Sequence, residues 1–95
     1  MQISNEKKEK ISEQILSFLY LRYPNPAFTS QVATEIARDE EFVKTLLNSL
    51  KDKKIISEIR KNAKGIQYLR RTRWRMNDGV YQKYKALSKQ IPDNN

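Results

Sequence analysis

The stretch from Phe28 to Ile56, FTSQVATEIARDEEFVKTLLNSLKDKKII, predicts two helices that are joined by a very short turn. Residues 29–37 carry a stripe of small apolar side chains at helical spacing, which permits close contact with a neighbouring helix. Residues 39–53 begin with a capping aspartate and two glutamates, and continue with apolar residues every three or four positions. We therefore expect a short helix, a tight turn and a longer amphipathic helix.

On the N-terminal side of this pair, apolar spacing predicts a further helix over residues 4–22, capped by Ser4 or Asn5. This helix must end before Pro24, because the residue that precedes a proline is pushed out of the helical conformation. Residues 23–28 are then expected to form an extended connector.

On the C-terminal side, alternating apolar and polar residues predict a β-hairpin over residues 55–76, with its turn at residues 62–65. That turn would place Ile59 opposite Tyr68 and Ile55 opposite Thr72. A final helix is expected over residues 78–91. The fold class expected from these elements is α+β and mostly helical, with residues 1–95 forming a single domain.

The composition excludes several classes of site. The 95 residues include no cysteine and no histidine, which removes disulfides, thiolate zinc sites and the commonest catalytic base. The acidic run at residues 39–41 is more simply a helix start than a metal site, so no enzyme, cofactor or metal is expected. The longest apolar run, residues 15–21, is far shorter than the ~20 residues of a membrane span. We expect a soluble protein of the cytoplasm, associated with the nucleoid.

The positive charge of the chain is concentrated in its second half. Residues 1–53 carry equal numbers of basic and acidic side chains, so residues 54–95 account for the whole net charge of +8. Seven basic residues and no acidic residue lie between Arg60 and Arg75. Such a localised positive field is typical of a surface that binds a polyanion such as nucleic acid.

Three stretches resemble the winged helix-turn-helix fold. FTSQVATEIA at residues 28–37 is similar to the segment that opens the helix-turn-helix in many archaeal and bacterial transcriptional regulators. VKTLLNSLKDKKII at residues 43–56 looks like a recognition helix running into the first wing strand. RTRWRMNDGVYQKY at residues 71–84 resembles the wing strand and closing helix of MarR-type and PadR-type regulators. The resemblance implies a small regulator of archaeal type, cellular or viral, with a basic wing.

The DNA-binding residues follow from this architecture. In the helix over residues 39–53, burial of the apolar side chains leaves the polar side chains facing outward. There lysine can pair with guanine, asparagine with adenine, and threonine with either hydrogen-bonding base edges or the thymine methyl group. The start of the second helix could bind a phosphate through free backbone N–H groups, or its polar residues could only be caps. The expected DNA-binding residues are Thr29, Ser30, Gln31, Lys44, Thr45, Asn48, Lys51, Arg60, Lys61, Lys64, Arg70, Arg71 and Arg73.

The first and last helices are expected to form a homodimer interface, with packing inside one subunit as the alternative. A dimer would hold two recognition helices about one DNA turn, ~34 Å, apart. Its expected residues are Ile11, Ile15, Tyr20, Tyr81, Tyr84, Leu87 and Ile91. The aromatic residues Phe28, Tyr68 and Trp74 are expected in the core rather than as a platform for stacked bases.

The function expected from charge and resemblance together is that of a sequence-specific transcriptional regulator that binds double-stranded DNA as a homodimer. Two alternatives remain at this point: an architectural chromatin protein that binds without sequence preference, and a winged-helix module that binds proteins.

Overall fold

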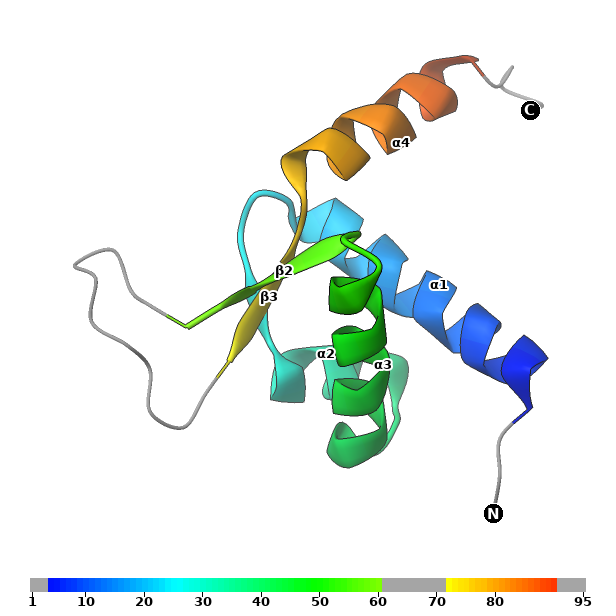
Figure 1. The fold of residues 1–95 in the computed structure, drawn as a ribbon, viewed down its shortest axis with the longest axis vertical. Helices are drawn as coiled ribbons and strands as arrows, with labels where there is room; N and C mark the ends of the chain where they lie inside the picture. Colours follow the sequence, from blue (N-terminus) through cyan, green and yellow to red (C-terminus); the bar gives the residue numbers. More distant parts are fainter. Residues whose placement is uncertain (1–3, 61–71, 91–95) are drawn as a thin grey trace.

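The computed structural model describes residues 4–60 and 72–90, which form four helices and a three-stranded antiparallel sheet (Figure 1). This confirms the α+β, mostly helical fold class, and each helix end lies within one residue of its expected position. The elements are α1 (Asn5–Arg22), β1 (Ala27–Phe28), α2 (Thr29–Ile36), α3 (Glu40–Asp52), β2 (Ile56–Ile59), β3 (Arg73–Met76) and α4 (Asp78–Gln90).

The starts of α1 and α3 are stabilised by side-chain caps. The Lys7 backbone N–H donates to Ser4 Oγ at 3.2 Å, and the Phe42 N–H donates to Asp39 Oδ2 at 3.1 Å. Helix α2 begins at Thr29, as expected, and its N-cap residue is Phe28, whose side chain makes no cap bond. There Gln31 Oε1 accepts the Phe28 backbone N–H at 2.8 Å. The Phe28 N–H, which has no partner within the helix backbone, is thus satisfied by a side chain of the first helical turn.

The turn between α2 and α3 is tight because Ala37 adopts a left-handed conformation, with φ of 55°. Its backbone N–H and that of Arg38 bond back to the last turn of α2, at 3.2 Å to Thr34 O and 3.0 Å to Ala33 O respectively. The expected arrangement of a short helix, a tight turn and a longer helix is therefore observed.

The sheet has the order β1-β3-β2, with β3 in the centre. Ile56 pairs with Met76 and Ile59 with Arg73. The expected register was wrong, because Ile59 lies opposite Arg73 rather than Tyr68; the turn expected at residues 62–65 lies outside the described residues. The expected wing sheet had two or three strands, and its third strand comes from the segment expected as a connector, where Ala27 and Phe28 pair with Trp74 and Arg73.

The core lies between the helices α1, α2 and α3 and the inner face of the sheet. Trp74 is completely buried, and its indole Nε1–H donates to Thr29 Oγ1 at 2.8 Å. The expected core position of Trp74 is therefore confirmed. Of the other two aromatic residues expected in the core, Phe28 is half-buried and Tyr68 lies outside the described residues. The fully buried side chains of largest volume are Ile15, Leu19, Val32, Val43, Leu47, Ile56, Trp74 and Met76.

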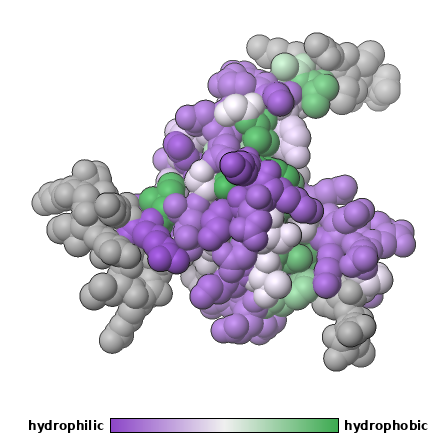
Figure 2. Space-filling model, viewed as in Figure 1, coloured by the Kyte–Doolittle hydropathy of each residue, from purple (hydrophilic) through white to green (hydrophobic). Residues whose placement is uncertain are grey.

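Helix α4 leaves the body directly after β3 and extends away from it (Figure 1). Only its first turns pack on the core, through Val80 and Tyr81, whereas Leu87 is 54% exposed. Hydrophobic atoms show along this helix on the face seen in Figure 2, while α3 is covered mostly by hydrophilic ones. In the part of the chain that the structure describes, no helix combines the length and apolar character of a bilayer span.

Candidate nucleic-acid interface

Helix α3 presents a polar row to solvent because its opposite face is fixed in the core. Val43, Leu46, Leu47 and Leu50 are buried, and this leaves Lys44 and Thr45 exposed with Asn48 and Lys51 half-exposed. These four polar residues fall on successive turns of one helix face. Their donors and acceptors are of the kinds that read base edges in a major groove.

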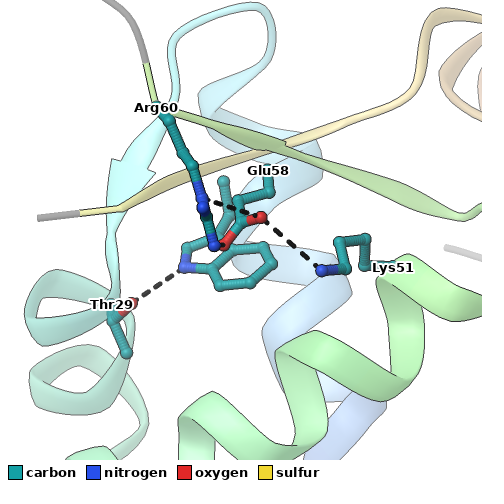
Figure 3. Close-up of polar contacts among 5 residues, drawn as sticks. Thr29, Lys51, Glu58 and Arg60 are labelled. Carbon is teal, nitrogen blue, oxygen red and sulfur yellow. Dashed lines mark hydrogen bonds and ion pairs between the residues drawn. The ribbon is translucent and has the colours of Figure 1, made fainter. Parts of the chain in front are cut away.

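A carboxylate joins this row to the base of the wing (Figure 3). Glu58 on β2 lies 3.5 Å from Lys51 Nζ on α3 and 3.2 Å from Arg60 Nε at the end of β2. The Glu58 side chain is only 15% exposed, whereas that of Arg60 is 58% exposed. The outward row of α3 and the described base of the wing therefore meet on one side of the molecule.

The N-terminal half of the same row borders a hollow of about 520 Å³. Lys44 of α3, Ser30 of α2 and Thr72 before β3 all line this hollow, so three separate segments converge there. Asp39, Glu40 and Glu41 line it as well, which makes this end of the row acidic. The charge along α3 is thus uneven, with three carboxylates near Lys44 and the cations Lys51 and Arg60 at the opposite end, where both pair with Glu58.

The structure distributes the expected DNA-binding residues unevenly. Ser30, Lys44, Thr45, Asn48, Lys51 and Arg60 lie on the surface described above. Thr29 is 8% exposed and its hydroxyl accepts the Trp74 indole proton, so its side chain is structural. The side-chain oxygen of Gln31 is bonded to the backbone of Phe28. Arg73 is half-buried, with its guanidinium carbon 5.9 Å from the centre of the Phe28 ring. Lys61, Lys64, Arg70 and Arg71 lie outside the described residues.

The expected dimer residues also divide into groups. Ile11 and Ile15 are 3% and 0% exposed inside the core of the subunit, so they cannot reach a second subunit and that assignment was wrong. Tyr20, Tyr84 and Leu87 line a groove of about 320 Å³ between α1 and α4. Tyr81 packs at its base, with its ring centre 5.1 Å from that of Tyr20. Ile91 lies outside the described residues.

An aromatic and ionic cluster holds the root of α4. The rings of Tyr23 and Tyr81 are stacked with centres 3.8 Å apart, and the Tyr23 hydroxyl donates to Asp78 Oδ1. Arg75 lies 3.7 Å from the same carboxylate oxygen and over the Tyr23 ring. The hydrogen bond to Asp78, followed by desolvation and the Asp78 charge, raises the pKa of Tyr23 above its ordinary value of 10.0. In contrast, no cluster of three or more potential metal ligands occurs among the described residues.

The sequence interpretation missed two residues that organise this surface. Glu58 bonds to Lys51 and Arg60. One signal marked it, because Glu58 is the single acidic residue between Asp52 and Asp78. Asn77 lies directly before α4, where asparagine is a common helix cap, yet its side chain bonds to Lys54 in the turn between α3 and β2 and to Ser57 in β2. Its position directly before a helix concealed this second role.

The order of these elements, a helix pair with a tight turn followed by a short sheet and a closing helix, defines a winged helix-turn-helix protein. Neither a protein-family model nor a curated protein sequence matches the chain. Among solved structures, 26 chains match. The three structures described next are each less than 25% identical to the chain, and at this level the likeness shows the MarR-like winged-helix fold.

Three of these structures illustrate the likeness. The first is the Staphylococcus aureus MepR–DNA complex, with a TM-score of 0.66 and 21% sequence identity. The match covers 92% of this chain and 63% of the MepR chain. The second is Bordetella bronchiseptica BpsR, whose DNA binding is regulated by 6-hydroxynicotinic acid. It matches with a TM-score of 0.59 and 16% sequence identity, over 93% of this chain and 64% of the BpsR chain. The third is the PcaV transcriptional regulator from Streptomyces coelicolor, solved with its natural ligand. It matches with a TM-score of 0.57 and 13% sequence identity, over 87% of this chain and 62% of the PcaV chain.

The chain spans a little under two thirds of the length of each of these three chains. The three proteins come from bacteria, so they do not support the archaeal origin that the sequence resemblance implied. MepR and PcaV are transcription regulators, and BpsR is a DNA-binding protein.

Proposed function

We propose that this protein is a transcriptional regulator that binds double-stranded DNA in a sequence-specific manner as a homodimer. In this proposal α3 enters the major groove while the base of the wing contacts the sugar–phosphate backbone. The observation that best supports it is the junction of Lys51, Glu58 and Arg60, because it brings the outward row of α3 and the wing to one side. A location on the nucleoid in the cytoplasm would follow from this function.

Each residue of the α3 row has a distinct proposed role. Asn48 lies in the middle of the row, where its amide can make a bidentate contact with adenine. Lys44 lies one turn earlier and can reach guanine, whereas the acidic residues near it would repel phosphates. Lys51 and Arg60 are suited to phosphates at the opposite end. In this arrangement Asn48, at the middle of the row, enters the major groove, and most phosphate contacts come from Lys51 and Arg60.

The groove between α1 and α4 is the proposed dimer interface. Tyr84 and Leu87 are exposed at 38% and 54%, although both are large apolar or aromatic residues beside a groove. Exposed apolar surface of this kind favours association with another protein surface. A second copy of the chain would cover it and supply the second recognition helix that a two-fold DNA site requires.

The decisive experiment is selection of bound duplexes from a random pool, with the mass of the complex measured alongside. We expect enrichment of one motif with two related half-sites, and two protein chains in each complex. The affinity should fall with salt, with a log–log slope on the order of −4 to −8 for a dimer.

Two substitutions separate base reading from backbone contact. Asn48→Ala removes the side-chain amide, so it should reduce the preference for the selected motif by about 1–3 kcal/mol at each adenine that Asn48 reads. Arg60→Ala should weaken binding to every duplex alike. A pool with no enriched motif and undiminished binding would favour the architectural alternative, and negligible binding at physiological salt would favour the protein-interaction module.

A further inference from the structure

Asn77 forms hydrogen bonds with the turn after α3, with strand β2 and with the first turn of α4. Its side-chain Nδ2 donates to Lys54 O at 2.8 Å, and its Oδ1 accepts from Ser57 Oγ. Its backbone N–H donates to Ile55 O at 3.1 Å. Asn77 is therefore bonded to Lys54 and Ile55 in the turn that follows α3, and to Ser57 in β2.

This turn is itself a fixed structure. Lys54 adopts a left-handed conformation with φ of 64°, and the Ile55 backbone N–H bonds to Leu50 O at 3.0 Å in the last part of α3. A non-glycine residue in this conformation persists only where its surroundings hold it. The bond from Asn77 to Lys54 O supplies part of that restraint.

Asn77 is also the last residue before α4. The Tyr81 backbone N–H donates to Asn77 O at 2.9 Å, so the helix begins from this residue. On the opposite side, Tyr23 stacks on Tyr81 and bonds to Asp78, which ties the same helical turn to the end of α1. The root of α4 is thus clamped between the end of α1 and the turn after α3.

The rest of α4 has little support from its own subunit. The described side chains from Gln82 to Ser88 are exposed, and the helix extends away from the body (Figure 1). Beyond the root, the Tyr84 ring lies 6.3 Å from the Tyr20 ring, centre to centre, across the groove beside α1. A helix that is held mainly at one end acts as a lever. Its direction relative to α3 is determined at the root, where a small rotation is multiplied by the helix length.

We infer that Asn77 is a positioning residue that sets the angle between α4 and the recognition helix α3. This inference rests on the proposed function, in which the outer part of α4 pairs two subunits and α3 reads DNA. In such a dimer the Asn77 joint fixes the distance between the two α3 helices, and therefore the half-site spacing that the protein accepts.

The joint can be tested without DNA. The chain contains no cysteine, so Ser49→Cys on α3 and Lys85→Cys on α4 place two spin labels at exposed, unique positions. Labelled protein is diluted into unlabelled protein, and electron–electron resonance then measures the distance within one chain. We expect one narrow distance distribution, and a distribution shifted or broadened by several ångströms in Asn77→Ser.

Serine retains the ability to cap a helix but is too short to reach Lys54 O, so Asn77→Ser removes the joint and keeps α4. Ser57→Ala, which removes one of the two side-chain bonds, should give a smaller change of the same kind. Asn25→Ser, the same substitution in the exposed connector between α1 and β1, serves as the control and should change nothing. Wild-type distributions in both Asn77→Ser and Ser57→Ala would overturn the inference. If Asn77→Ser does not fold, Ser57→Ala alone decides.

A second readout uses the selected DNA site with one base pair inserted between its half-sites. The insertion rotates one half-site by about 34° relative to the other. Wild-type protein should lose affinity about tenfold or more, whereas Asn77→Ser should lose less than about threefold. Equal losses would contradict the inference, because a purely structural role would weaken both sites alike. Failure of the wild type to bind DNA would refute the proposed function, while the distance measurement would still decide the role of Asn77.

Discussion

The hydrogen bond between Trp74 and Thr29 fastens the central strand of the sheet to the start of α2. Replacing Thr29 by valine preserves the shape of the side chain but removes the acceptor of the indole proton. Because Trp74 is 0% exposed, its N–H has no access to water in the folded protein. A buried donor that loses its partner costs about 1–3 kcal/mol. Thr29→Val should therefore lower the free energy of unfolding by about that amount.

The assay is urea unfolding followed by tryptophan fluorescence and by circular dichroism. Trp74 is the only tryptophan in the chain, so its fluorescence reports on this site directly. Coincident transitions from the two signals would justify a two-state fit, from which the free energy of unfolding is extrapolated to water.

Thr29→Ser provides the matched control, because serine retains the hydroxyl and loses only a methyl group, worth roughly 0.8 kcal/mol when buried. Valine retains both branches of the side chain and should still be the less stable variant. If Thr29→Val is as stable as Thr29→Ser or more stable, the bond contributes nothing and the reasoning is refuted.

Three further substitutions test other parts of the structure. Glu58→Gln frees Lys51 and Arg60, so duplex affinity should rise and the log–log salt slope should steepen by about 1–2 per subunit; an unchanged slope would contradict this. Leu87→Asp places a charge in the groove between α1 and α4, so light scattering should show a monomer with unchanged helix content. Tyr23 has a raised pKa in the folded state because of Asp78, so its contribution to stability is complete below pH 10 and is lost as the pH rises through the folded-state pKa. Tyr23→Phe should therefore flatten the loss of stability above pH 10 in urea titrations.

The helices could be predicted from the sequence because each carries an unambiguous local signal. Ser4 and Asp39 cap their helices, and buried residues such as Leu46 and Leu50 recur at helical spacing. The sheet was predicted less well. Strand β1 has only two residues, too few to show any period, and its pairing with β3 depends on contacts between distant segments. The expected register was derived from a turn placed at residues 62–65, and the observed pairing of Ile59 with Arg73 contradicts that register.

The candidate site was predicted in part, for a related reason. Helical spacing correctly placed Lys44, Thr45 and Asn48 on the outer face of α3. Spacing cannot show which side chains find partners across the fold. Thr29 was assigned to the surface as a polar residue at a helix start, but a buried tryptophan from β3 needs its hydroxyl.

The central strand of the sheet, β3, follows both β1 and β2 in the chain. Neither β1 nor β2 has a hydrogen-bonded neighbour until β3 lies between them, and β3 brings the two wholly buried residues Trp74 and Met76. On the ribosome, a nascent chain that stops short of residue 73 therefore exposes the inner faces of its helices and two unpaired strand edges. Such a chain is a target for chaperones and proteases, and folding becomes cooperative only when residues 73–76 emerge.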